Sequence, residues 1–116
     1  NKAVGASFED ACLTQLRSTF GPNAVFNRSV EIIFDTSSGD YLIADAVLVV
    51  SGVPKLIVEM KSSETASFTP NQRKGYPIIA KHGGILKANN SPFPAIKTVV
   101  MYPNTIDPTK IPKLDL

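Results

Sequence analysis

Apolar and polar residues follow one another along the chain in patterns that predict several short elements. The most informative stretch covers 41–61, where two runs rich in Ile, Leu and Val flank a short turn at 51–54. Such runs, separated by turn residues, predict a β-hairpin. A further strand is expected at 29–34, joined to the hairpin by a polar turn at 36–40. Three consecutive strands with short connections favour an antiparallel meander.

The residues before these strands predict a helix that starts near Phe8 and ends at Gly21-Pro22. Ser7 and Asp10 have the spacing of a capping box. Apolar residues recur on one face of this helix at helical spacing, namely Phe8, Cys12, Leu13, Leu16 and Phe20. Glu9 falls within the same apolar sector and therefore needs a partner. It lies at the rim of the core, forms a structural pair with an arginine, or points toward the acidic residues of the strands, Asp45 and Glu59.

A second helix is predicted after a polar loop at 62–67. Thr69 is a suitable N-cap residue, and Pro70 suits the first helical position. Gly75 should weaken this helix and Pro77 should kink it. Residues 82–84, His-Gly-Gly, are expected to close the element.

The remainder of the chain predicts a loop at 91–94, a strand at 97–102 and an irregular arm at 103–116. A strand that follows a helical crossover is expected to lie parallel to a strand already in the sheet. The predicted fold is therefore of the α/β (α+β) class, with the order αβββαβ and a mixed sheet flanked by helices.

Length and composition are consistent with one ordinary globular domain over 1–116, cut from a longer chain because residue 1 is not Met. No apolar run reaches the roughly 20 residues that a membrane helix needs. The single cysteine, Cys12, excludes an intrachain disulfide. Charge is unevenly distributed, with a net −3 over residues 1–60 and +5 over residues 61–116. This distribution suits a polyanionic substrate that meets acidic residues placed early in the chain.

Charged residues occur in the hairpin where core residues would be apolar. Asp45 is the only charge between positions 42 and 50, and Glu59 and Lys61 share one face of the second strand. An isolated buried carboxylate is costly, so buried charges are normally paired or bound to metal. The alternative is a solvated strand end with a structural ion pair. We favour a divalent metal site with a cationic neighbour, held by Asp45 and Glu59, with Glu9 as a further candidate.

The predicted site has the groups that phosphodiester hydrolysis requires. The reaction needs a metal to polarise the phosphate, a group to position water and cations to meet the developing charge. Asp45 and Glu59 suit Mg²⁺, which prefers one or two carboxylates, and Mn²⁺ or Zn²⁺ are alternatives. Lys61 could contact both the attacking water and the scissile phosphate.

The order αβββαβ, with Asp45 followed by Glu59-Met60-Lys61, resembles the PD-(D/E)xK superfamily of restriction-endonuclease-like nucleases. The resemblance implies a catalytic set of Glu9, Asp45, Glu59 and Lys61. Ala44 stands where the family name has proline.

The second helix adds to this resemblance. The segment Gln72-Arg73-Lys74-Gly75-Tyr76 is similar to the Gln-x-x-x-Tyr motif of one branch, which implies substrate-binding roles for Gln72, Arg73, Lys74 and Tyr76. In that branch the glutamine and tyrosine lie beside the site.

The small size and the segment from Thr69 to Pro77 resemble the C-terminal toxin domains of bacterial polymorphic toxins, including those of contact-dependent growth inhibition. The resemblance implies secretion as part of a larger toxin, action in the cytoplasm of the target cell and a cognate immunity protein.

Three functions follow from these observations: a DNA nuclease, an RNA nuclease acting on tRNA, and an inactive nucleic-acid-binding module. All four catalytic positions are filled, which argues against the third. We favour DNA, because Arg73, Lys74, Lys81 and Lys87 could supply part of a basic surface.

Overall fold

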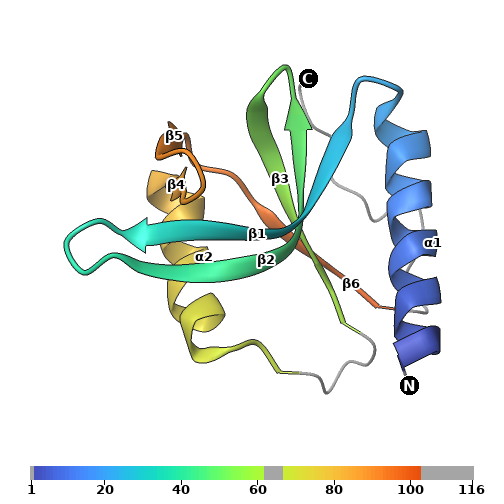
Figure 1. The fold of residues 1–116 in the computed structure, drawn as a ribbon, viewed down its shortest axis with the longest axis horizontal. Coiled ribbons are helices and arrows are strands. Elements are labelled where there is room, and N and C mark those ends of the chain that lie inside the picture. Colours follow the sequence, from blue (N-terminus) through green and yellow to red (C-terminus); the bar gives the residue numbers. More distant parts are fainter. Residues whose placement is uncertain (1, 62–66, 103–116) are drawn as a thin grey trace.

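The computed structural model describes residues 2–61 and 67–102. Over these residues the protein is of the α+β type, with two helices and a six-stranded mixed sheet (Figure 1). The elements in chain order are α1 (Lys2–Phe20), β1 (Val25–Asp35), β2 (Asp40–Val50), β3 (Val53–Met60), α2 (Pro70–His82), β4 (Gly84–Leu86), β5 (Ser91–Phe93) and β6 (Thr98–Met101). The predicted sequence of one helix, three strands, a helix and a last strand is present, with two additional short strands.

The strands are arranged in the order β5-β4-β1-β2-β3-β6. β1, β2 and β3 form the predicted antiparallel meander, and β6 pairs in parallel with β3. The prediction of a parallel last strand after a helical crossover is therefore confirmed. This places β3 between β2 on one side and β6 on the other.

β4 and β5 form a small hairpin between α2 and β6 that the sequence pattern did not predict. Each has three residues, and β5 includes part of the stretch expected to be a loop. β4 joins the sheet by pairing with β1, with Ile32 opposite Leu86 and Ile33 opposite Ile85. Strands this short carry too few residues for an alternating pattern, and their pairing depends on β1, which is distant in the sequence.

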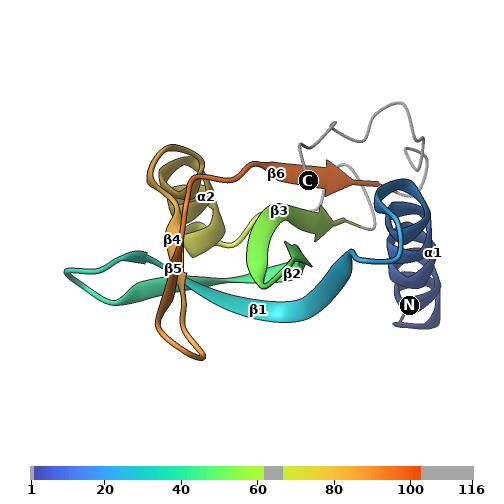
Figure 2. The ribbon, with the colours of Figure 1, turned by 90° about the horizontal axis from the view of Figure 1, so that it is seen from above.

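The two helices contact separate parts of the core and lie toward opposite ends of the molecule (Figures 1 and 2). One core cluster contains Leu13 and Leu16 of α1, and the other contains Tyr76 and Ile79 of α2. On β3, neighbouring residues alternate between the clusters, with Leu56 in the first and Ile57 in the second. The helices therefore cover opposite faces of this strand.

The long β1–β2 hairpin changes the face that it presents to each helix near Asp45. Leu42 packs in the α2 cluster and Leu48 in the α1 cluster, although both positions have the same parity. In a regular strand, residues of the same parity face one side, so the ribbon rotates between them. Ser29, which lies across from Asp45 in the register, has φ of 53°, and this local turn of the backbone accompanies the rotation.

α1 begins earlier than the sequence pattern indicates. It spans Lys2–Phe20, so Ser7 lies inside the helix and does not cap its start near Phe8. The capping-box prediction is therefore wrong. The apolar stripe is correct, since Cys12, Leu13 and Leu16 are all buried.

α2 begins as predicted. Thr69 is the N-cap, its side chain accepts from Gln72 N, and Gln72 Oε1 accepts from Thr69 N, which completes a capping box. The helix continues through Pro77 to His82. Gly75 is required by packing, because a Cβ at this position would lie 2.5 Å from the Phe34 ring. The absent side chain lets α2 approach β1 closely.

Two predicted segments fall partly or wholly outside the described residues, namely the arm at 103–116 and most of the loop at 62–67. Over residues 2–61 and 67–102, neither helix combines the length and the apolar character that crossing a membrane requires.

Candidate active site

Asp45 and Glu59 meet at the point where β2 and β3 separate. Pairing of the two strands ends at Ala46 opposite Val58, so the next two residues in register are Asp45 and Glu59. Here hydrogen bonds from backbone amides to side-chain carboxylates replace the backbone hydrogen bonds between the two strands. Asp45 N donates to Glu59 Oε1 at 3.2 Å, and Met60 N donates to Asp45 Oδ2 at 2.8 Å. Each carboxylate is thus fixed by a backbone amide at the opening between the strands.

Glu59 is held mainly through one of its two oxygens. Besides the Asp45 amide, Oε1 accepts from the Tyr76 hydroxyl and from Gln72 Nε2 at 3.3 Å. Gln72 is itself fixed, because its Nε2 also donates to Ile43 O at 2.9 Å. Side chains from α2 therefore orient a carboxylate that is 0% exposed.

The second oxygen of Glu59 is in a different position. Glu59 Oε2 is buried and has no hydrogen-bond partner. Lys61 Nζ lies 3.9 Å from it, which is an ion pair but is beyond hydrogen-bonding distance. An unsatisfied buried carboxylate oxygen is expensive, and it is the kind of atom that a bound cation satisfies.

The donor set fits a hard divalent cation. Mg²⁺ is commonly bound by one or two carboxylates and completes its coordination with water and substrate phosphates. Asp45 and Glu59 supply such a pair. Within residues 2–61 and 67–102 there is no group of three or more His, Cys, Asp or Glu residues that could hold a metal ion.

The electrostatics of Glu59 follow from its burial. Burial raises the pKa of Glu59 from its ordinary value of 4.5 to about 7; the nearby Asp45 carboxylate also raises it, and the Tyr76 hydrogen bond opposes the rise. The pKa of Tyr76 is raised by burial and by its bond to Glu59, so Tyr76 stays a neutral donor. A cation that needs the ionised carboxylate would displace a proton from Glu59 near neutral pH.

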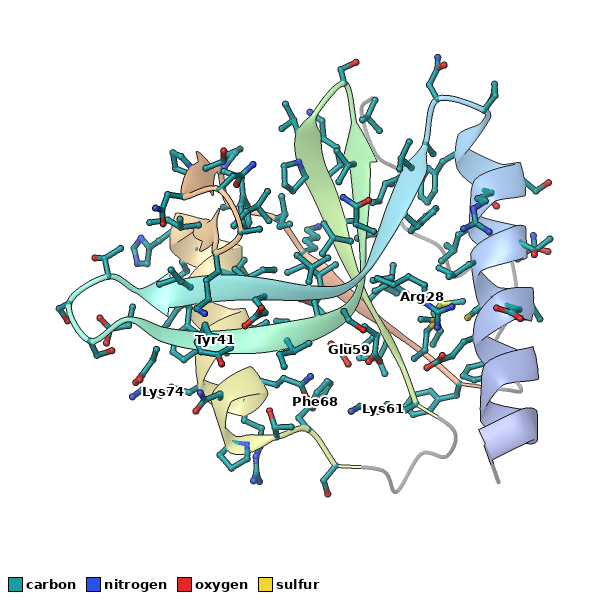
Figure 3. The ribbon with its side chains drawn as sticks, viewed as in Figure 1. Arg28, Tyr41, Glu59, Lys61, Phe68 and Lys74 are labelled. Atoms are coloured by element: carbon teal, nitrogen blue, oxygen red, sulfur yellow. The ribbon has the colours of Figure 1, made fainter. Side chains whose placement is uncertain are left out.

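Lys61 lies beside this carboxylate with its ammonium group held by three neighbours. Its side chain is 14% exposed. Nζ donates to Ser67 O at 3.3 Å, lies 4.8 Å from the centre of the Phe68 ring and is 3.9 Å from Glu59 Oε2. Figure 3 shows Glu59, Lys61 and Phe68 gathered between the end of β3 and the start of α2.

Glu9 does not join the acidic residues of the strands. It forms an ion pair with Arg28 of β1, with 2.5 Å between Glu9 Oε2 and Arg28 Nη2, and Arg28 lies beside α1 (Figure 3). Both side chains are partly exposed, at 32% and 44%. Of the alternatives for Glu9, the structure therefore shows the pair with an arginine, and it does not bring Glu9 to Asp45 and Glu59 as a third ligand. Glu9 does face the sheet, but the strand it meets presents an arginine there.

The remaining predicted residues divide between the two sides of α2. Gln72 and Tyr76 are buried against Glu59, while Arg73 and Lys74 are exposed. Arg73 lines a cavity of about 310 Å³ between α2 and β6, together with Phe68 and Tyr76. The two basic residues are thus at the surface beside the site and do not contact the carboxylates.

Sequence reasoning missed two features of the site. Phe68 received no role, because an isolated aromatic residue before a helix start has many uses. A groove of about 560 Å³ also runs from Asp45 along β2 to the partly exposed Tyr41, with the first turn of α2 as its other wall. Its β2 wall follows the alternation of Tyr41, Ile43 and Asp45, which the sequence does carry.

Comparisons with protein-family models, with curated proteins and with solved structures found no match to this chain.

Proposed function

We propose that this chain is a metal-dependent nuclease of the restriction-endonuclease-like, PD-(D/E)xK type that hydrolyses phosphodiester bonds of DNA. One observation carries the proposal. Glu59 is fully buried and three donors fix its Oε1. Its Oε2, which lies near Asp45 and Lys61, has no hydrogen-bond partner. A fold that maintains such a costly oxygen gains most from it when a cation binds there.

Asp45 and Glu59 would hold the divalent cation, and Mg²⁺ fits their oxygen donors best. When bound, such a cation supplies Lewis-acid polarisation of the phosphate and offsets the charge that develops in the reaction. Mn²⁺ and Zn²⁺ are the alternatives to test.

The residues of the chain have separable tasks in hydrolysis. A water oxygen forms a bond to phosphorus, the bond from phosphorus to the leaving oxygen breaks, and a proton passes from water to the leaving oxygen. Lys61 offers a positive charge and N–H donors where negative charge accumulates on the phosphate. Gln72 and Tyr76 keep the Glu59 carboxylate in one orientation, which limits reorganisation during the step.

The substrate side of the proposal rests on exposed basic residues. Arg73 and Lys74 lie on α2 beside the site, and contacts from such residues to phosphates dominate the affinity for nucleic acid. Lys87 is a weaker candidate for this role, because it pairs with Glu31 at 3.6 Å and lies over the Tyr41 ring. The same chemistry would cut RNA, so tRNA is the alternative substrate.

We further propose that the domain acts as a bacterial toxin. It would be delivered as part of a larger secreted protein into the cytoplasm of a target cell, and an immunity protein would protect the producer. The support is the resemblance of the motif order and of the segment at 69–77. Induced expression in a bacterial cytoplasm should stop growth for the wild type and not for Lys61→Ala.

A cleavage assay tests the nuclease proposal. Plasmid DNA and total RNA are incubated in parallel with wild type or Lys61→Ala, in Mg²⁺, Mn²⁺, Zn²⁺ or EDTA. Loss of plasmid that requires metal and Lys61 is the expected result. Loss of tRNA alone would keep the site and change the substrate. If folded wild type cuts neither, the nuclease proposal is contradicted and a nucleic-acid-binding module becomes the better explanation.

A further inference from the structure

The ammonium group of Lys61 lies beside Glu59 Oε2 without being hydrogen-bonded to it. The separation of 3.9 Å contrasts with about 2.8 Å for a direct ammonium–carboxylate bond. Lys61 Nζ instead bonds to Ser67 O and lies over the Phe68 ring. Opposite charges in a buried site attract strongly, so something must hold the lysine back.

The Phe68 ring is placed to do this. It offers its negative face to Nζ at 4.8 Å, which is well within the range of a cation–π interaction. It also meets the Tyr76 ring edge-on, with centroids 5.9 Å apart and planes at 76°. Tyr76 in turn donates to Glu59 Oε1. One aromatic ring thus contacts both the lysine and the tyrosine that orients the carboxylate.

The position of the lysine decides whether Oε2 is available. An ammonium bonded directly to Oε2 would occupy the side of the carboxylate that a divalent cation needs. Held by Phe68 and Ser67 O, the same ammonium leaves Oε2 without a hydrogen bond and stays close enough to meet a phosphate. The metal-free protein therefore bears the free-energy cost of a buried Oε2 without a hydrogen bond, and a bound cation would remove that cost.

We propose that Phe68 is a positioning residue that keeps Lys61 from closing onto Glu59 Oε2 and so maintains the cation site. The inference rests on the proposed function, because it concerns how the metal site stays open. It assigns a role to a residue outside the resemblance, in the segment that links the end of β3 to α2. Without Phe68, we expect the Lys61 ammonium to compete with the metal for Glu59 Oε2.

The first test measures Mn²⁺ affinity by titration calorimetry, without substrate. Phe68→Leu should raise the Kd roughly tenfold, as expected when a largely buried cation–π contact is lost. Phe68→Tyr should keep the wild-type Kd because it retains an aromatic face. In a Lys61→Met background, Phe68→Leu should change the Kd less than about twofold, because the competing ammonium is absent. Phe20→Leu, at a partly buried phenylalanine of α1, is the matched control for packing.

The second test follows the Lys61 side chain directly by NMR in metal-free protein. Its Hε protons should be shifted upfield by the Phe68 ring, remain so in Phe68→Tyr, and lose the shift in Phe68→Leu and not in Phe20→Leu. A folded Phe68→Leu protein with wild-type Mn²⁺ affinity would overturn the inference, as would a Kd increase of equal size in the Lys61→Met background.

The two tests also separate this inference from the proposed function. If the wild type binds no Mn²⁺ at all, the metal site itself is rejected, and the positioning role with it. If the wild type binds Mn²⁺ and Lys61 shows no ring shift, the metal site stands and only the role of Phe68 is rejected.

Discussion

The two helices contact the sheet in different ways. α1 contributes mainly packing, whereas α2 also contributes polar contacts to the candidate site. α1 contributes buried apolar residues such as Leu13 and Leu16, and its ion pair to Arg28 lies at a partly exposed edge. α2 also packs apolar residues, but it directs two polar side chains, Gln72 and Tyr76, onto a fully buried carboxylate. The comparison indicates that α1 stabilises the sheet and that α2 positions the carboxylate of the candidate site.

Two glutamates illustrate the same contrast. Glu9 is neutralised by an arginine near solvent, and pairs of this kind contribute about 0–1 kcal/mol. Glu59 is buried with one oxygen unsatisfied, and burying a charge incompletely costs several kcal/mol. An arrangement that lowers stability is retained most readily where function requires it. This is why Glu59, and not Glu9, marks the site.

The largest predicted effect comes from the groups at the opening between β2 and β3. Asp45→Ala and Lys61→Ala should each lower cleavage roughly a thousandfold or more, because each removes charge from the reacting centre. Both proteins should remain folded by circular dichroism. Asp40→Asn, at the start of the same β2 strand, is the matched control. Retained cleavage by folded Asp45→Ala would remove Asp45 from the site.

A smaller effect is expected from the helix side chains that hold Glu59. Tyr76→Phe deletes the hydroxyl that donates to Oε1, and loss of such an orienting group typically costs 10- to 100-fold in metal affinity or activity. Tyr41→Phe is the control, because Tyr41 is partly exposed on β2 and is not a donor to Glu59. Initial cleavage rates at saturating metal, with Mn²⁺ titrations, would separate the two consequences. Equal rates for the two variants would contradict the role given to α2.

The pH dependence of stability provides a third test on metal-free protein. The pKa of Glu59 is raised from 4.5 to about 7, so the folded state favours the protonated form. The stabilising effect of protonation is fully present below the unfolded pKa and is lost as pH rises through the folded one. Wild type should therefore lose roughly 2 kcal/mol relative to Glu59→Gln between pH 5 and pH 8, as measured by urea unfolding in EDTA. Parallel curves for the two proteins would show that burial does not perturb Glu59.

The smallest effect is predicted on the α1 side. Glu9→Gln should change the free energy of unfolding by less than about 1 kcal/mol, with a difference that shrinks in high salt. Cleavage should stay within about twofold of wild type, because Glu9 pairs with Arg28 away from Asp45 and Glu59. A hundredfold loss of cleavage in this variant would return Glu9 to the catalytic set.

Much of the fold is written in local patterns. The β2–β3 hairpin, the Thr69 cap and the apolar stripe of α1 each depend on neighbouring residues, and each was predicted. The β4–β5 hairpin depends on pairing with distant β1, and no short pattern carries that information. Ser7 illustrates the opposite error, because a plausible local cap is overridden when the helix continues beyond it.

The candidate site shows the same division. The proximity of Asp45, Glu59 and Lys61 was predictable from the sequence, because strand pairing and two-residue periodicity fix their relative positions. The partner of Glu9 was not predictable from the sequence, because it depends on which β1 residue lies against the helix. The role proposed for Phe68 was not predictable either, because it depends on contacts with Lys61 and Tyr76 that only the tertiary structure creates.

Calorimetric titration of Mn²⁺ into wild type and Glu59→Gln at pH 8 shows directly whether Glu59 Oε2 binds a cation. The substitution keeps the size of the side chain and its neutral hydrogen bonds while removing the anionic oxygen. We expect one Mn²⁺ bound per wild-type chain and at least tenfold weaker binding by the variant, because the variant lacks a charged ligand. Equal affinity in the two proteins would contradict a cation site at Glu59 Oε2.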